Sequence, residues 1–282
     1  MSRAYEDTVA LVTGATDGHG RALAERLARL GVTVHVHGRS EEKLAAAVRE
    51  IVEATGNERV HPHRADFAKL AEVRAMADEI AALDALHLLI NNAGMGSGFP
   101  DSRERQESAD GIELRFAVNY LAGYVLTERV LPLLQRSAPA RIVMVASRGQ
   151  AAIDFDDPML RSTFYEGRRA YAQSKLAQII YAVDLADRLG LGSDVTVNAL
   201  HPSTYMPTKI VLAQNGESID PLERGVEATL RLAIDPELDQ VSGRYFDREE
   251  ESRAEAQAYD PEARRTLREL SEELAGDAPA RS

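Results

Sequence analysis

Short apolar runs alternate along the chain with longer segments in which apolar residues recur at helical spacing. The runs predict buried strands at residues 8–13, 32–37, 59–63, 86–90, 141–146 and 195–200, and a last short strand at 243–246. The periodic segments predict helices at residues 21–30, 41–54, 68–83, 113–136, 167–189, 222–233 and 264–274. Such alternation favours right-handed βαβ crossovers, and therefore an α/β fold with a doubly wound, mostly parallel sheet covered by helices on both faces.

Local signals support several of these boundaries. Ser40 is a good N-cap for the second helix, and Gly56 is placed to end it. Gly31 has the same terminal position after the first helix, and Pro132 is expected to kink the end of the long fourth one. No break in composition marks a linker, so we expect residues 1–282 to form a single domain. Its core would cover about residues 6–246, and the charge-rich part at 247–282 would be a helical extension packed on it.

Composition narrows the possible classes of function. Hydrophobic residues make up 44% of the 282 residues and the formal net charge is −12, which argues against nucleic acid or an anionic membrane as partner. The chain has no cysteine, which excludes disulfides, thiolate metal sites and cysteine nucleophiles. No apolar run approaches the ~18 residues that a membrane span needs. The first residues are polar and acidic and lack a signal-peptide pattern, so the sequence predicts a cytoplasmic protein.

Unusual residues gather where the predicted strands end. In open parallel sheets, ligands bind outside the carboxyl ends of the strands, so this coincidence predicts a ligand site along one edge of the sheet. In chain order, the residues are Gly14 to Gly20, Arg39, Asp66, Asn91 to Gly94, Ser147 and His201-Pro202.

The first of these clusters is a glycine-rich turn between a strand and a helix. Gly14, Gly18 and Gly20 have the spacing G-x-x-x-G-x-G, which lets the backbone approach a pyrophosphate while the helix N-terminus points bare N–H groups at it. NAD-binding units usually have an acid near the end of the second strand, to bind the ribose 2′-hydroxyl. Here that place has Arg39 and Ser40, and an arginine suits a 2′-phosphate. The pattern therefore favours NADP(H) over NAD(H).

A second cluster has the chemistry of a proton donor. Tyr171 and Lys175 are four residues apart on a predicted helix, so their side chains share one face. A nearby cation lowers the pKa of a phenol from near 10 by roughly 1–3 units, which makes tyrosine a usable acid and base. Ser147 follows the fifth predicted strand and could hydrogen-bond a carbonyl oxygen beside them.

In this order and approximate spacing, the motifs Thr13 to Gly20, Asn91-Asn-Ala-Gly94, Asn119, Ser147 and Tyr171-x-x-x-Lys175 resemble the short-chain dehydrogenase/reductase family over residues 6 to 246. The resemblance implies a Rossmann-type domain with a seven-stranded sheet. It makes Tyr171 the general acid/base, with Ser147 orienting the carbonyl, Lys175 holding the nicotinamide ribose and Asn119 anchoring a proton-relay water. The cofactor contacts that it implies, together with the residues above, are Gly14, Thr16, Asp17, Gly18, His19, Gly20, Arg39, Asp66, Phe67, Asn92, Ala93, Gly94, Tyr171, Lys175, Pro202, Thr204 and Thr208.

The distance from Ser147 to Tyr171, 24 positions, is longer than is common in that family. The extra residues, from Ile153 to Gly167, resemble the retinol-dehydrogenase-like and protochlorophyllide-reductase-like branch, whose members often act on bulky lipophilic carbonyls. Apolar residues in the neighbouring loops fit this expectation: Met95, Phe99, Met159, Tyr205 and Met206. We therefore expect hydride transfer between NADP(H) and a carbonyl or secondary alcohol of a small-molecule substrate, by a monomer or a homo-oligomer.

Two positions depart from the family pattern. His19 stands where an aliphatic residue is usual, and it either affects cofactor binding or is a tolerated substitution. Ser203 replaces the usual glycine after Pro202, and Thr204 and Thr208 compete for the role of the threonine that binds the cofactor amide or a phosphate.

Other chemistries fit the sequence less well. The pairs His35/His37 and His61/His63 each share a strand face, but no carboxylate at ligand spacing joins them, so no metal site is expected. A serine hydrolase is disfavoured because the residues around Ser147 lack the first glycine of a nucleophile elbow. Two alternatives stay open: a tailoring enzyme of this fold that catalyses a dehydration or epimerisation, and a non-catalytic NADP-binding regulator.

Overall fold

The central strands of the sheet are buried on both faces, as the apolar runs predict. The computed structural model describes residues 4–98, 103–162, 164–204, 206–207 and 218–276. Within them, eight strands lie in the order β3-β2-β1-β4-β5-β6-β7-β8, all parallel except the antiparallel pair β7 and β8. Their bounds are β1 (Val9–Val12), β2 (Thr33–Gly38), β3 (Val60–Arg64), β4 (Leu88–Asn91), β5 (Ala140–Val145), β6 (Val195–His201), β7 (Tyr245–Asp247) and β8 (Glu250–Ser252).

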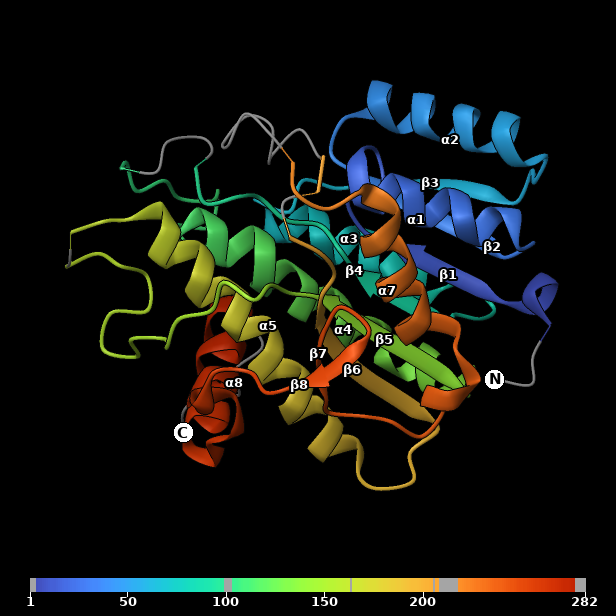
Figure 1. The fold of residues 1–282 in the computed structure, drawn as a ribbon. Coiled ribbons are helices and arrows are strands. Elements are labelled where there is room, and N and C mark those ends of the chain that lie inside the picture. Colours follow the sequence, from blue (N-terminus) through green and yellow to red (C-terminus); the bar gives the residue numbers. More distant parts are fainter. Residues whose placement is uncertain (1–3, 99–102, 163, 205, 208–217, 277–282) are drawn as a thin grey trace.

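Helices cover both faces of this sheet, which confirms the α/β fold class (Figure 1). One face packs against α1 (Gly18–Arg29), α2 (Glu41–Thr55) and α7 (Leu222–Ile234). The other packs against α3 (Leu70–Ala81), the π-helical segment η2 (Phe116–Leu121), α4 (Ala122–Arg136) and α5 (Gly167–Leu189). The remaining helical segments are η1 (Tyr5–Asp7), η3 (Pro236–Leu238), η4 (Ala256–Tyr259) and α8 (Pro261–Ala275).

Neighbouring residues of each central strand point to opposite cores. In β1, for example, Leu11 joins the core under α3, α4 and α5, whereas Ala10 and Val12 join the core under α1, α2 and α7. Because both faces are covered by helices, the strands are apolar throughout rather than alternating, which is the pattern seen in the sequence.

The predicted helix ends at Ser40 and Gly56 are confirmed. The Ser40 side chain accepts a hydrogen bond from the Lys43 N–H at 3.4 Å, and Gly56 ends α2 with a left-handed φ of 70°. Gly31, after α1, also has a positive φ of 91°.

The expectation of seven strands is wrong, because β8 adds an eighth at the edge beside β7. Its residues, Glu250 to Ser252, are all exposed and contain no apolar side chain, so the hydrophobic pattern could not reveal them.

The long helix expected at 113–136 is also interrupted, because η2 gives its first part a wider π-helical turn. α8 packs against α5, where Arg268 donates to Asp184 Oδ1 at 2.6 Å (Figure 1). It also contacts η2, where Tyr120 and Ser271 share a 2.6 Å hydrogen bond.

Candidate active site

The glycine-rich turn between β1 and α1 lies directly against the segment that follows β4. Gly14 and Gly18 have φ values of 65° and 51°, which side chains rarely tolerate. A Cβ on Gly14 would lie 2.8 Å from the Cα of Ala93. Asp17 caps α1 by accepting a hydrogen bond from the Gly18 N–H at 2.9 Å. The turn therefore forms a cradle that packs closely against Ala93 at a helix N-terminus, and this arrangement fits the pyrophosphate of a dinucleotide.

A buried histidine that the sequence analysis did not assign to this site holds the turn in place. The Gly14 N–H donates to Nδ1 of His37 at 3.1 Å, and Nε2 of His37 lies 3.0 Å from the Ala65 carbonyl oxygen. Burial lowers the pKa of His37 to about 4, so the ring is neutral and carries its proton on Nε2. The only signal for His37 in the sequence is its pairing with His35 on one strand face, which was weighed as a metal site and set aside.

The expected adenosine end of the site lies at the ends of β2 and β3. Phe67 stacks on His37 with ring centroids 4.1 Å apart, and the Asp66 N–H is held by Glu72 Oε2 at 2.9 Å. Gly38 lies against the methyl group of Thr16 in the glycine-rich turn. Arg39, the next residue, is exposed and therefore lies beside this turn. Arg64 pairs with Gly38 in the sheet register and adds a second exposed cation that was not predicted.

His19 points into the protein. Its Nδ1 lies 2.9 Å from Asn92 Oδ1, and its Nε2 lies 3.2 Å from the Thr229 hydroxyl on α7. Asn92 Nδ2 in turn donates to the Thr13 carbonyl at 2.8 Å, which fixes the amide with its oxygen toward His19. The polar side chain thus connects α1, α7 and the end of β4, where an aliphatic residue would only pack.

Ser147 and Tyr171 are brought together across Gly149. A Cβ placed on Gly149 would lie 3.5 Å from Ser147 Oγ and 3.9 Å from Cε1 of the Tyr171 ring. Ser147 Oγ accepts a hydrogen bond from the Gly149 N–H at 3.0 Å, so its own hydrogen can be donated to a ligand. The loop after β5 and the first turns of α5 therefore bring the Ser147 hydroxyl and the Tyr171 ring to the same point.

Lys175 lies one turn further along α5 and is buried. Its Nζ is 5.8 Å from the centroid of the Tyr171 ring, and it donates to the Val145 carbonyl and to Gln178 Oε1, both at 2.9 Å. Desolvation lowers the pKa of Lys175 from 10.5 to about 7. Gln178 was missed in the sequence, although its position three residues after Lys175 places both on one helix face.

Asn119 lies in the π-helical segment η2 and contacts two of the predicted site segments. Its Nδ2 donates to Ser174 Oγ at 2.9 Å and to the Met95 carbonyl at 3.2 Å, and its Oδ1 accepts from the Met95 N–H at 2.7 Å. A Cβ on Gly94 would lie 3.2 Å from Asn119 Oδ1 and 3.6 Å from Lys175 Nζ. Single π-helical turns often mark functional sites, and here the turn brings Asn119 between α5 and the segment after β4.

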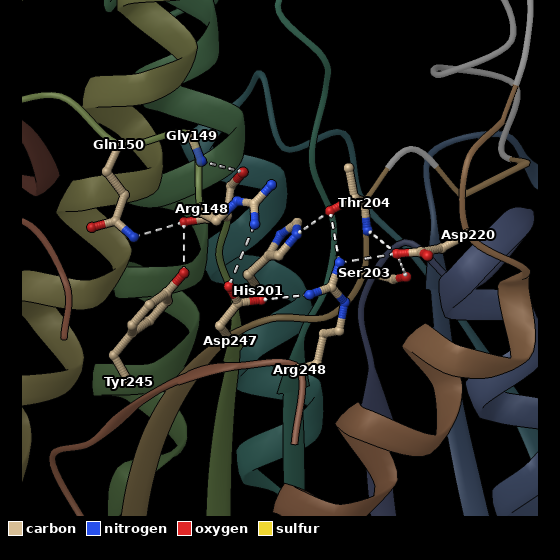
Figure 2. Close-up of polar contacts among 11 residues, drawn as sticks. Arg148, Gly149, Gln150, His201, Ser203, Thr204, Asp220, Tyr245, Asp247 and Arg248 are labelled. Atoms are coloured by element: carbon tan, nitrogen blue, oxygen red, sulfur yellow. Dashed lines mark hydrogen bonds and ion pairs between the residues drawn. The ribbon is translucent and has the colours of Figure 1, made fainter. Parts of the chain in front are cut away.

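The loops after β5, β6 and β7 form one hydrogen-bonded cluster beside Ser147 (Figure 2). The Ser147 carbonyl accepts bonds from Gln150 Nε2 at 2.9 Å and from the Tyr245 hydroxyl at 3.3 Å. The cluster continues through Arg148, which pairs with Asp247 at 3.7 Å. These contacts fix the backbone at Ser147 from the side of the sheet edge.

Asp220 holds the loop that follows β6. Its Oδ2 accepts bonds from the Ser203 hydroxyl at 2.8 Å and from the Thr204 N–H at 3.0 Å, which lowers the pKa of this carboxyl (Figure 2). Arg248, in the β7–β8 turn, adds bonds to Asp220 Oδ2 at 3.3 Å and to Thr204 Oγ1 at 3.2 Å. Ser203 and Thr204 are therefore used to shape this loop within the protein. Thr208 lies outside the described residues, as do Phe99 and Tyr205.

The long insert before α5 is attached to the segment that precedes η2. Arg105 donates to the Met159 carbonyl at 2.7 Å, and Arg161 donates to the Gly111 carbonyl at 2.9 Å. On its other side, Gln257 Nε2 donates to the Ile153 carbonyl at 3.0 Å. Both methionines were expected to lie in loops near the substrate. Met159 instead packs in the core, and Met95 is partly buried.

The part of the chain that the structure describes has neither a metal-binding cluster nor a membrane-spanning helix. No group of three or more histidine, aspartate or glutamate side chains there could hold a metal ion, although His35 and His63 share a 2.7 Å hydrogen bond. No helix there is long and apolar enough to cross a membrane.

The structure thus brings a glycine cradle at a helix N-terminus and a serine–tyrosine–lysine group to the same edge of a Rossmann-type sheet. Residues 8–217 match the short chain dehydrogenase family, and the chain belongs to that family. It is 35% identical over 290 residues to retinol dehydrogenase 13 of Mus musculus, with 96% of this chain and 84% of that protein covered. It is 32% identical to polyprenol dehydrogenase of Homo sapiens, with 96% and 86% covered.

A solved structure shares the fold. A putative short chain dehydrogenase from Escherichia coli CFT073, complexed with NADPH, has a TM-score of 0.67 and 26% identity, with 86% of this chain and 97% of that chain covered. The resemblance to the retinol-dehydrogenase-like branch is thus confirmed, and the protein is an oxidoreductase of this family.

Proposed function

We propose that the protein is an NADP(H)-dependent carbonyl reductase or alcohol dehydrogenase in which Tyr171 is the general acid and base. The observation that supports this best is the approach of Ser147 Oγ and the Tyr171 ring to the same point beside Gly149, with Lys175 Nζ 5.8 Å from the ring centroid. A carbonyl oxygen at that point could accept hydrogen bonds from both hydroxyls.

The cradle fits a dinucleotide because it lies at the N-terminus of α1, and the close approach of Gly14 to Ala93 keeps the turn tight against the segment after β4. When bound, NADPH supplies the hydride for the carbonyl carbon. Tyr171 donates its phenolic proton to the carbonyl oxygen, and Ser147 donates a hydrogen bond to the same oxygen. Lys175 stabilises the phenolate that remains, which then takes a proton from solvent. Alcohol oxidation uses the same groups in reverse.

A preference for NADP(H) is supported by the end of β2. Arg39 is exposed beside the glycine turn where NAD-binding units usually have an acid, and Arg64 ends the adjacent strand β3. Two cations at this edge suit a 2′-phosphate, which carries negative charge that a free hydroxyl lacks. The related E. coli structure contains NADPH, which is consistent with this preference.

A bulky lipophilic substrate is supported by the insert before α5 and by the relatives, whose names refer to retinol and polyprenol. The test is an NADPH-consumption screen over ketones and aldehydes of increasing apolar size, with product identification. We expect kcat/KM to rise with apolar size, and a consistent preference for small polar carbonyls would contradict this substrate class. The cytoplasmic location, the single-domain division and the oligomeric state remain predictions.

A further inference from the structure

A buried charged network joins the segment that follows β4 to the segment that leads into α5. Arg115 is fully buried at 0% exposure, and Glu113 is 1% exposed. Arg115 Nε donates to the Gly96 carbonyl at 3.0 Å and Nη2 donates to the Ser97 carbonyl at 3.1 Å. Its Nη1 donates to the Tyr165 hydroxyl at 2.7 Å, and that hydroxyl donates to Glu113 Oε1 at 2.8 Å.

The segments that meet at this network are those that carry the predicted active site. Gly96 and Ser97 directly continue the segment Asn92 to Met95, which lies against the glycine turn and Asn119. Tyr165 comes two residues before the start of α5, the helix with Tyr171. Glu113 Oε2 accepts a bond from the Phe116 N–H at 2.7 Å, at the start of η2. One guanidinium therefore joins all three segments.

Burial makes this arrangement stiff. A charge removed from water must be paired and fully hydrogen-bonded, so alternative positions of Arg115 are costly. Its planar fork also fixes the directions of its partners, which a lysine ammonium could not do. The Gly96 and Ser97 carbonyls and the Tyr165 hydroxyl are consequently held at fixed positions relative to one another.

We propose that Arg115 is a positioning residue for carbonyl reduction. It fixes the gap between the segment 94–97 and the beginning of α5, so that a carbonyl bound in this gap meets the Tyr171 hydroxyl. This inference rests on the proposed function. It adds a residue that does not touch the reacting atoms but controls their alignment through Tyr165. Small misplacements at a reacting centre can lower rates up to about a hundredfold.

The chain offers a matched control for the test. A second tyrosine–glutamate–arginine group joins α4 and α5 away from the site. There the Tyr181 hydroxyl donates to Glu128 Oε1 at 2.9 Å, and Arg188 donates to both oxygens of Glu128 at 2.8 and 2.9 Å. Tyr165→Phe and Tyr181→Phe each remove one hydroxyl from such a group and leave the ring in place.

We expect Tyr165→Phe to lower kcat/KM for the best carbonyl substrate by about tenfold or more, with the Kd for NADPH unchanged. Tyr181→Phe should leave both values at the wild-type level, even where it lowers Tm equally. Arg115→Lys keeps the buried charge but loses the fork, and should show the same kinetic loss as Tyr165→Phe. Wild-type kcat and KM in folded Tyr165→Phe or Arg115→Lys would overturn the positioning role.

A second readout separates this inference from the proposed function. Hydrogen exchange at the amides of residues 94–97 should be faster in Tyr165→Phe than in Tyr181→Phe, and equal rates would overturn the positioning role. If the wild-type protein oxidised NADPH with none of the carbonyls in the screen, the proposed function would be refuted. The exchange rates would still decide whether Tyr165 holds the segment 94–97.

Discussion

The ammonium of Lys175 donates a hydrogen bond to the backbone carbonyl of Val145, at 2.9 Å. Val145 is the last residue of β5, and Ser147 follows it by two positions, so this bond ties the lysine of α5 to the strand that delivers the serine. Because Tyr171 lies one turn before Lys175 on the same helix, the bond also limits the motion of the phenol relative to Ser147. The proposed catalytic group is thus preorganised by a contact between a strand end and a helix.

The buried lysine should make stability depend on pH. Burial lowers the pKa of Lys175 from 10.5 to about 7, so between these values the unfolded chain binds more protons than the folded one. The contribution of Lys175 to the free energy of unfolding therefore increases as the pH rises through this window, by up to about 1.4 kcal/mol per pH unit. Lys175→Met removes this contribution.

Urea denaturation of the wild type and of Lys175→Met at several pH values measures the effect. The wild-type protein should gain stability relative to the variant as the pH increases from neutral to alkaline. A difference between the two proteins that is constant with pH would show that Lys175 keeps its ordinary pKa.

The cofactor preference should depend on Arg39. Arg39→Asp places an acid where a 2′-phosphate is proposed to bind, and it restores the residue type that suits a 2′-hydroxyl. The ratio of NADPH to NADH affinity should fall by at least about tenfold, the loss expected for one charged hydrogen bond. Arg49→Asp changes the net charge equally at an exposed position of α2 and is the matched control. An unchanged ratio in titrations of Arg39→Asp would reject the phosphate contact.

His19 should contribute to stability through its two hydrogen-bond partners. In His19→Leu the Asn92 carbonyl oxygen and the Thr229 hydroxyl both lose their contact with the ring. The Thr229 hydroxyl keeps its bond to the Gly225 carbonyl at 2.9 Å, so the loss falls on Asn92 Oδ1. One polar group left without its partner costs about 1–3 kcal/mol, so the free energy of unfolding should fall by about that amount. His61→Leu, at an exposed position of β3, is the comparison. Equal stability of His19→Leu and the wild type would mean that the network is not stabilising.

Features that depend on local pattern were predictable from the sequence. The glycine turn, Arg39, Ser147 and Tyr171 all follow or begin elements with a clear apolar period, and the parallel sheet brings strand ends to one edge. The bounds of α5, Gly167–Leu189, were predicted without error for the same reason. Such signals are contained in a few consecutive residues.

Features that depend on distant contacts could not be predicted. Arg115 looks like a solvent-facing residue of a helix, and its burial follows only because Tyr165 approaches from 50 positions away in sequence. The contact of His37 with the Gly14 N–H forms only when β1 and β2 are packed side by side. β8 forms because the turn at Arg248 returns the chain along β7, and its own side chains are polar.

The central claim is that Tyr171 donates the proton in carbonyl reduction, and its most direct test is the turnover of Tyr171→Phe. NADPH oxidation with the best carbonyl substrate should fall by at least about a hundredfold, the low end for loss of a general acid. The Kd for NADPH, measured by fluorescence titration, should change far less than turnover, because the cradle at Gly14 is untouched. Turnover within twofold of the wild type would contradict the account.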